Sequence, residues 1–275
     1  MKRAIGLLGR GGLFAVVALY TAFAAGPFLW VATMSLRTTS EISIDHYAWP
    51  AKWHWEKFGQ AWFNSNYNVY FGNSLIVVVS AVALLTVIGS MAAHCFARYR
   101  FRGNRALYFI VFSAIIFPPQ ITIIALFQIL VQYGLYNTLA GLALVYVAVQ
   151  LPLTVYILET FFARIPGDLF DAARIDGYPE WQIFWKVSLP IALPAIATAV
   201  ILNTILLWNE FLYAVVITDE SKRTLPLGIQ RFMGDQLEDV GMIATGLMIA
   251  IVPVVLIYAF FSEKLIQGMT AGAVK

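Results

Sequence analysis

A short polar stretch between two apolar segments decides how the rest of the chain is interpreted. It reads Gly167-Asp168-Leu169-Phe170-Asp171-Ala172-Ala173-Arg174-Ile175-Asp176-Gly177 and continues to Leu189-Pro190. Asp168 follows a Pro-Gly pair, where an aspartate can cap free amides and favour the positive end of a helix dipole. Gly177 supplies a left-handed stop, and Pro179 suits the first turn of a new helix. The sequence therefore predicts a short helix, a glycine hinge and a second helix.

The composition places this stretch in a membrane protein. The chain is 60% hydrophobic and 12% charged, whereas soluble domains are about a quarter charged. A helix that crosses a bilayer needs a run of about twenty apolar residues. Six such runs are present, at 13–36, 71–96, 106–131, 138–158, 189–212 and 240–261. We expect an all-α integral membrane protein with six transmembrane helices.

The distribution of Lys and Arg sets the expected orientation. A cytoplasmic N-terminus puts twelve of these residues inside and six outside, in line with the positive-inside rule. Arg98, Arg100, Arg102 and Arg105 cluster in one short loop and carry most of this signal. We expect both termini and the polar stretch to be cytoplasmic. The net charge of +3 is thus a topology signal, and we expect no nucleic-acid partner.

Proline and polar residues interrupt the apolar runs at two places. The third run contains Phe117-Pro118-Pro119-Gln120, and paired prolines inside a membrane helix predict a kink beside a polar cavity. Gln120 could line such a path or bond a neighbouring helix. The fifth run ends near Glu210, a candidate functional residue because a carboxylate near the end of a membrane helix is costly unless it faces protein or water. Alternatively, Glu210 simply lies at the outer interface, and both alternatives stay open.

Catalytic and metal-binding patterns are missing from the sequence. There is no Gly-x4-Gly-Lys-Ser/Thr phosphate loop, no Ser-His-Asp set and no pair of carboxylates,. His94 and Cys95 are adjacent but lack the further ligands of a metal site,. We expect a transport subunit with no catalytic residue, metal or cofactor of its own, and not an enzyme.

The polar stretch carries a family resemblance. Permeases of ABC importers have the pattern Glu-Ala-Ala, three residues, Gly, nine residues, then Ile-x-Leu-Pro. Here Asp171-Ala172-Ala173 is followed by three residues, Gly177, nine residues and Val187-Ser188-Leu189-Pro190. The spacing matches without a gap, and Asp171 and Val187 are conservative departures. The chain therefore resembles these permeases.

Other segments resemble the smaller, maltose-type permease of the carbohydrate branch. They are Arg98 to Gly103, Pro118-Pro119, Asn137-Thr138, Trp208-Asn209-Glu210-Phe211, Thr224-Leu225-Pro226 and the tail from Gly268 to Lys275. The resemblance implies a type I ABC importer permease fold. Residues 1–70 would hold the first helix and an external aromatic segment. Residues 71–275 would form the permease core, with a docking loop at 164–190 and a C-terminal tail at 262–275.

The resemblance also implies a function and partners. The chain would be a permease subunit of a binding-protein-dependent importer that carries a sugar or sugar derivative across a bacterial or archaeal inner membrane. Its partners would be a second permease of different sequence in a heterodimer, two copies of a cytoplasmic ABC ATPase that hold ATP and Mg, a periplasmic or surface solute-binding protein, and membrane lipid. The energy would come from ATP hydrolysis in those ATPase subunits.

Three sets of site residues follow from the resemblance. The ATPase-docking set, which includes the coupling helix, is Asp171, Ala172, Ala173, Gly177, Leu189 and Pro190. The substrate-pathway set is Gln120, Asn203, Trp208, Asn209, Glu210 and Tyr213, although these residues would serve equally for packing. The binding-protein contact set is Asp219, Glu220, Ser221 and Lys222.

Three other functions compete with this interpretation. One is an ABC importer for a non-sugar solute such as a phosphorylated polyol or an oligopeptide. Another is a secondary carrier driven by an ion gradient, against which stand the missing internal repeat and the missing acidic residue in the centre of a helix. The last is a membrane enzyme, which the missing catalytic pattern disfavours.

Overall fold

The computed structural model describes residues 2–233 and 239–273, with side chains described for residues 12–118, 121–233 and 239–262. Helices and turns make up these residues, and no strand occurs among them, so the predicted all-α class is confirmed. The chain divides into two compact units. The first comprises residues 1–68 and 228–252, and the second comprises residues 69–227 and 253–275.

Five helical segments in the described residues are long and apolar enough to cross a membrane. They cover residues 12–35, 67–98, 139–162, 180–208 and 240–262. A sixth is obtained if residues 104–116 and 121–132, which meet at an angle of 107°, are counted as one broken span. The predicted set of six apolar spans is therefore confirmed in number when this broken pair is included.

The expected kink in the third span is a complete break. Helix α5 (Asn104–Ser113) and the short 3-10 helix η2 (Ala114–Ile116) end before Phe117, and α6 begins at Pro119 and runs to Gln132. Phe117 and Pro118 have extended backbones, with ψ angles of 127° and 133°. A proline pushes the preceding residue out of the helical region. Because two prolines are adjacent, this restriction acts twice and the helix cannot continue.

The first unit is built on α1 (Lys2–Ser35), α2 (Thr39–Ile44), α3 (Glu56–Gly59), the π-helix η1 (Gln60–Asn64), the 3-10 helix η5 (Ile229–Phe232) and the first half of α13 (Val240–Ala273). A capping box between Thr38 and Glu41 starts α2,. The buried Arg37 guanidinium donates to the backbone oxygens of Glu41 at 2.7 Å and Asp45 at 2.6 Å, which closes the other end of α2. Lys57 in turn donates to the Arg37 carbonyl oxygen at 2.6 Å.

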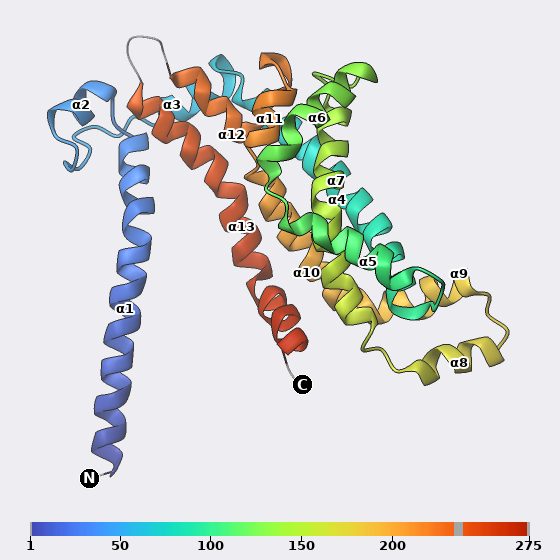
Figure 1. Cartoon of the computed structure of the whole chain (residues 1–275). Coiled ribbons are helices and arrows are strands. Elements are labelled where there is room, and N and C mark those ends of the chain that lie inside the picture. Colours follow the sequence, from blue (N-terminus) through green and yellow to red (C-terminus); the bar gives the residue numbers. More distant parts are fainter. Residues whose placement is uncertain (1, 234–238, 274–275) are drawn as a thin grey trace. The chain divides into compact units, whose positions relative to one another are not determined.

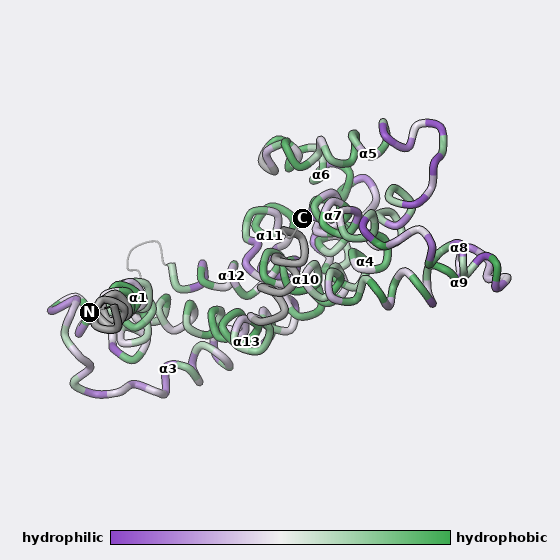
Figure 2. The backbone as a smooth tube through the Cα atoms, turned by 90° about the horizontal axis from the view of Figure 1, so that it is seen from below, coloured by the Kyte–Doolittle hydropathy of each residue, from purple (hydrophilic) through white to green (hydrophobic). Residues whose placement is uncertain are grey.

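The second unit contains most of α4 (Tyr67–Arg98), the broken pair, α7 (Leu139–Phe162), α8 (Gly167–Ile175), α9 (Glu180–Ile183), the π-helix η3 (Phe184–Ser188), α10 (Leu189–Trp208), α11 (Leu212–Ile217), the 3-10 helix η4 (Glu220–Lys222) and most of α12 (Leu225–Gly228). Helices α7 and α10 pack together, and the buried Asn203 amide of α10 donates to Thr154 Oγ1 of α7 at 2.9 Å. Helices α8 and α9 lie at one end of this pair (Figure 1). Figure 2 shows hydrophobic residues along α7 and α10.

The last helix extends further than predicted. Helix α13 is continuous from Val240 to Ala273 and contains Pro253. The segment expected as a tail, 262–275, is thus helical as far as Ala273. The side chains of this segment beyond residue 262 lie outside the described residues.

Candidate functional site: a helical hairpin and a cavity beside the broken span

The predicted stop after the polar helix is present in the structure. Gly177 has a φ of 82°, and its N–H donates to the Arg174 carbonyl at 3.0 Å, while the Tyr178 N–H donates to the Ala173 carbonyl at 3.0 Å. These two bonds are those of a Schellman motif, which satisfies the last carbonyls of a helix and favours glycine at its left-handed position. The chain then turns into α9 and forms a helical hairpin, α8–α9.

The start of α8 differs from the prediction. Pro166 occupies the N-cap position and no side chain caps the helix, so the expected cap by Asp168 is wrong. Asp168 lies inside the first turn, where its carboxylate still favours the positive end of the helix dipole. Pro179 is the N-cap of α9 rather than a first-turn residue.

Helix α8 has one buried face and one exposed face. Phe170 and Ala173 are buried, with 4% and 5% of their surface exposed. Asp171 and Ala172 are exposed, as are the apolar residues Leu169 and Ile175. Ala173 therefore does not lie on the exposed face of α8, because its methyl group packs into the core of its own unit. Its part in docking stays a prediction.

The remaining docking candidates lie at different places. Gly177 is exposed at the turn of the hairpin. Leu189 is half-buried and Pro190 is exposed, and both belong to the start of α10, beyond η3. Sequence reasoning did not name Leu169 or Ile175, because alternating exposure is visible only once the rotation of the helix is known.

Ion pairs close the α8–α9 hairpin. Arg174 lies 2.9 Å from Asp171 Oδ1 through Nη1 and 2.9 Å from Glu180 Oε1 through Nε. The hydrogen bond with Glu180 raises the pKa of Arg174. The Tyr99 hydroxyl, at the end of α4, donates to Glu180 Oε2 at 2.8 Å, and burial raises the pKa of Tyr99 to about 12. Both groups therefore keep their protons at neutral pH.

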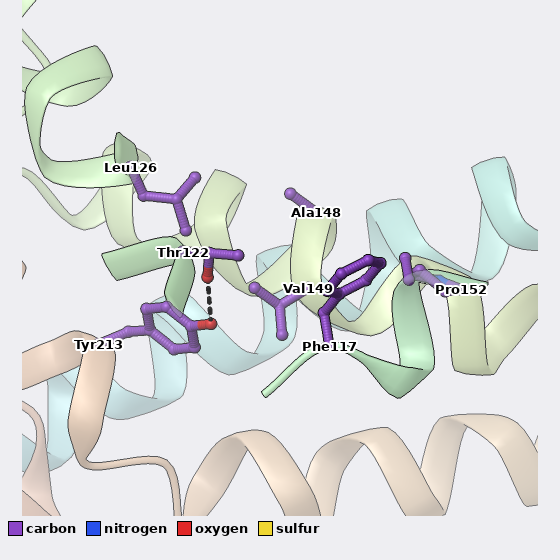
Figure 3. Close-up of a pocket in the computed structure, with 8 residues that line it drawn as sticks. Phe117, Thr122, Leu126, Ala148, Val149, Pro152 and Tyr213 are labelled. Atoms are coloured by element: carbon purple, nitrogen blue, oxygen red, sulfur yellow. Dashed lines mark hydrogen bonds between the residues drawn. The ribbon is translucent and has the colours of Figure 1, made fainter. Parts of the chain in front are cut away.

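A cavity of about 240 Å³ lies beside the break in the third span. Among the residues with described side chains, eight line it: Ala114, Phe117, Thr122, Leu126, Ala148, Val149, Pro152 and Tyr213. Figure 3 shows the Tyr213 hydroxyl turned toward Thr122, 3.1 Å from its Oγ1, and the Phe117 ring near Val149 and Pro152. The cavity is thus mostly apolar, with a pair of hydroxyl groups on one wall. The paired prolines signalled its position, whereas no sequence pattern pointed to Thr122.

The structure separates the other predicted pathway residues. Asn203 and Trp208 are buried; Asn203 bonds Thr154, and the Trp208 ring packs edge-on against Phe71 with 5.6 Å between centroids. Asn209 is exposed and donates to the Ile205 carbonyl at 2.8 Å. The side chain of Gln120 lies outside the described residues. Of the five whose side chains are described, Tyr213 lines the cavity.

Glu210 holds the junction between α10 and α11. Its Oε2 accepts from the Tyr146 hydroxyl at 2.7 Å, and its Oε1 accepts from the Tyr213 N–H at 2.8 Å. The Ala214 N–H also donates to Oε2, at 3.2 Å. Three donors from the protein satisfy this carboxylate near the end of a membrane helix, as an apolar environment requires. This arrangement favours a structural role for Glu210.

The predicted binding-protein loop is fixed at its base. Asp219 accepts from the Tyr136 hydroxyl at 3.1 Å, and its N–H donates to Asn137 Oδ1 at 2.9 Å. The Asn73 amide donates to the carbonyls of Ser221 at 3.3 Å and Arg223 at 3.0 Å. The residues Asp219, Glu220 and Ser221 are exposed, and Lys222 is half-buried. The loop therefore presents a polar tip on an anchored base.

The apolar spans, the broken span beside a cavity and the polar hairpin define a multi-pass membrane transport protein. Residues 85–269 match the family model described as "Binding-protein-dependent transport system inner membrane component". The chain belongs to this family of importer permeases, and its resemblance to them is confirmed.

Curated relatives agree over nearly the full length. The chain is similar to the diacetylchitobiose uptake system permease protein NgcG of Streptomyces coelicolor, with 37% identity over 94% of this chain and 86% of the relative. It is 33% identical to the trehalose transport system permease protein SugB of Mycobacterium tuberculosis over 94% of both chains. A probable ABC transporter permease protein of Bacillus subtilis, YurM, is 30% identical over 98% of this chain and 89% of the relative.

Solved structures share the fold. A chain in the crystal structure of a bacterial ABC transporter for alginate import has a TM-score of 0.79 at 20% identity, covering 95% of this chain and 96% of that chain. A second structure of a bacterial alginate ABC transporter, in complex with an alginate pentasaccharide-bound periplasmic protein, gives a TM-score of 0.66 at 15% identity over 91% and 93% of the two chains. The predicted permease fold is confirmed.

Proposed function

We propose that this permease imports an oligosaccharide or a sugar derivative across a bacterial or archaeal inner membrane, with both of its termini in the cytoplasm. The relatives with named solutes support this, since they are permeases for diacetylchitobiose and trehalose. The Lys and Arg distribution supports the orientation. In this orientation the α8–α9 hairpin faces the cytoplasm, and the loop at residues 219–222 faces outward.

The observation that carries the mechanism is the exposed face of α8. Leu169, Asp171, Ala172 and Ile175 form a small surface with apolar and acidic residues. An ATPase subunit that binds this face would hold ATP and Mg in its own site and hydrolyse the ATP. Closure of an ATPase dimer moves the permease only if the closed dimer binds one permease conformation more tightly than the other.

Two further partners complete the proposed importer. A second permease of different sequence would form the other half of the translocation path, and a solute-binding protein would contact the exposed tip at Asp219, Glu220 and Ser221. The alginate transporter with its bound periplasmic protein provides a precedent for the second contact. Lipid would surround the exposed apolar side chains of the spans.

The central experiment measures ATPase activity of the assembly in lipid, with its binding protein loaded from a panel of sugars. We expect one loaded sugar to stimulate hydrolysis and uptake together.

The variant Ala172→Arg, on the exposed face of α8, should abolish both, because a long charged side chain separates α8 from the ATPase subunit. Ser43→Arg, at an exposed position of α2, is the control and should behave as wild type. If only a phosphorylated polyol or a peptide stimulates the ATPase activity, the solute is not a sugar. If uptake is driven by an ion gradient without ATP, the protein is not an ABC importer.

A second experiment tests whether solute passes the cavity. Ala148→Trp would fill much of the space beside Phe117 and Tyr213, so uptake should fall at least about tenfold while the ATPase still binds, given the cost of overpacking. Leu144→Trp is the control, because Leu144 is one turn away on α7, exposed, and not part of the lining. Equal uptake in the two variants would contradict a path through this cavity.

A further inference from the structure

Two residues at the end of α4, Arg98 and Tyr99, contact both helices of the α8–α9 hairpin. The Arg98 guanidinium lies over the Phe170 ring, with 4.2 Å from Cζ to the ring centroid. The same group donates to the carbonyl oxygens of Phe162, at 2.5 Å, and Ile165. The next residue, Tyr99, bonds Glu180 of α9. Arg98, the last residue of α4, and Tyr99, which follows it, thus contact both helices of the hairpin and the end of α7.

Each of these contacts suits the transfer of force. A guanidinium over an aromatic ring is attracted to the ring face and also keeps its planar hydrogen bonds. The Phe162 carbonyl lies at the C-terminal end of α7, where a cation is favoured by the helix dipole,. Ile165 follows three residues later. Phe170, Phe162 and Ile165 are buried in one cluster, and closely packed groups cannot slide past one another without losing contacts. Arg98 therefore ties α8, α7 and α4 together.

The covalent route from the hairpin into the membrane passes through an irregular helical turn. Between α9 and α10 the chain passes through the π-helix η3, Phe184–Ser188. A π-helical turn interrupts the regular hydrogen-bond ladder and often marks a functional position in a helix. A displacement of α8 that travelled only along the chain would have to cross this segment before it reached α10.

We infer that Arg98 and Tyr99 are positioning residues that pass the movement of the α8–α9 hairpin to α4 and α7, so that transport is coupled to ATP through this contact as well as through α10. The inference rests on the proposed function, in which an ATPase moves α8. Arg98 touches neither the exposed face of α8 nor the cavity, so its role is to transmit the movement.

The test is the number of ATP molecules hydrolysed per solute imported by the reconstituted importer. Arg98→Gln removes the cation over Phe170 and should raise this ratio at least about fivefold, because about 1 kcal/mol of coupling corresponds to that factor. Arg98→Lys keeps the charge but loses the planar stacking and should be intermediate. Arg102→Gln is the control, since it removes one exposed positive charge from the turn after α4 and should leave the ratio unchanged.

A double-mutant cycle separates transmission from general destabilisation. Arg98→Gln and Phe170→Leu break the same contact, so their effects on the ratio should be strongly non-additive. Tyr99→Phe removes one hydrogen bond and is mild enough to keep the protein folded if Arg98→Gln is not. Its ratio should rise by a smaller factor. Additive effects in the cycle, or a wild-type ratio in Tyr99→Phe and Arg98→Lys, would overturn the inference.

A distance measurement tests the contact between α4 and the hairpin without measuring transport. Spin labels at Asp176→Cys and Arg102→Cys, in a Cys95→Ser background, should keep one distance in the ATP-free and ATP-bound importer if α4 and α8 move together. Arg98→Gln should make this distance differ between the two states. A distance that already changes in the protein with Arg98 intact would overturn the inference. Failure of the wild-type assembly to couple ATP to uptake would instead overturn the proposed function.

Discussion

Arg174 Nε lies 2.9 Å from Glu180 Oε1, so the last turn of α8 is bonded to the first turn of α9 across the turn at Gly177. The same guanidinium also bonds Asp171 at 2.9 Å. The two side chains thus fix the angle of the hairpin from its exposed side, whereas Phe170 and Ala173 fix it from the buried side. The hairpin therefore presents a surface of defined shape.

Removal of the Arg174 bridge should impair transport more than stability. We expect Arg174→Gln to lower the free energy of unfolding by less than about 1 kcal/mol, because all three side chains are at least 45% exposed and surface ion pairs contribute little,. Uptake should nevertheless fall, since the hairpin angle is no longer fixed. Thermal unfolding and uptake in proteoliposomes measure the two effects. Lys186→Gln, which removes a nearby charge from η3, is the control and should leave uptake unchanged. A large loss of stability in Arg174→Gln would contradict a role for Arg174 at the surface.

The turn at Gly177 should tolerate few residues. Its φ of 82° lies in the left-handed region, where a residue with a Cβ costs about 1–2 kcal/mol. Proline cannot adopt this φ and has no N–H for the Arg174 carbonyl. We expect uptake to decrease in the order Gly, Asn, Ala, Pro, measured against the amount of inserted protein. Gly167→Ala is the control, because a Cβ added at Gly167 has no atom within 4 Å and the φ of Gly167 is not positive. An equal loss of uptake in Gly167→Ala and Gly177→Ala would contradict the conformational explanation.

Glu210 should prove to be a stabilising residue. Glu210→Gln replaces one accepting oxygen by a donor that faces the Tyr146 hydroxyl or a backbone N–H, and we expect a loss of about 1.5–3 kcal/mol in the free energy of unfolding. Tyr146→Phe should cost about 1 kcal/mol, since it removes one of three donors. Thermal unfolding in lipid nanodiscs measures both variants. Asp176→Asn, at an exposed position, is the control. A change in solute affinity at unchanged stability would favour a pathway role for Glu210 instead.

The buried Lys57 should make stability depend on pH. Burial lowers the pKa of this ammonium group from 10.5 to about 8. Between pH 8 and 10.5 the unfolded chain therefore binds more protons than the folded protein, so stability rises with pH in this window. The slope of this contribution should approach about 1.4 kcal/mol per pH unit.

A comparison with variants isolates this contribution from other titrating groups. Lys57→Met should lack the rise in unfolding temperature between pH 8 and 10, whereas Lys52→Met, at an exposed position, should keep it. Identical pH profiles for wild type and Lys57→Met would show that Lys57 keeps an ordinary pKa in the folded protein.

Local chemistry explains what the sequence predicted well. Gly177 and the prolines act through their own backbone restrictions, so the stop of α8 and the interruption at Pro118 follow from the residues alone. The extent of that interruption did not follow, because a kink and a break share one sequence pattern. The rotation of α8 was also not predictable, since Ala172 and Ala173 are chemically alike and only the packing of Phe170 decides which of them is buried.

Contacts between residues far apart in the chain could not be predicted from the sequence. Arg98 was assigned to a charge cluster that sets topology, and nothing in the sequence links it to Phe170. Likewise Glu210 was left open between two roles, because the donors that satisfy it come partly from Tyr146 on another helix. A side chain's partners on other elements depend on how the helices pack, which a single sequence does not specify.

The break at Phe117 and Pro118 changes which backbone groups at this depth are satisfied. In a continuous helix, Pro118 and Pro119 would donate to the carbonyls of Ala114 and Ile115, and they have no N–H with which to do so. The break supplies a donor of its own, because the Phe117 N–H donates to the Ala114 carbonyl at 3.4 Å. This peptide oxygen is therefore satisfied within the protein, as the interior of a membrane requires. The interruption of the helix thus lies beside a cavity of about 240 Å³ without leaving this carbonyl bare at its edge.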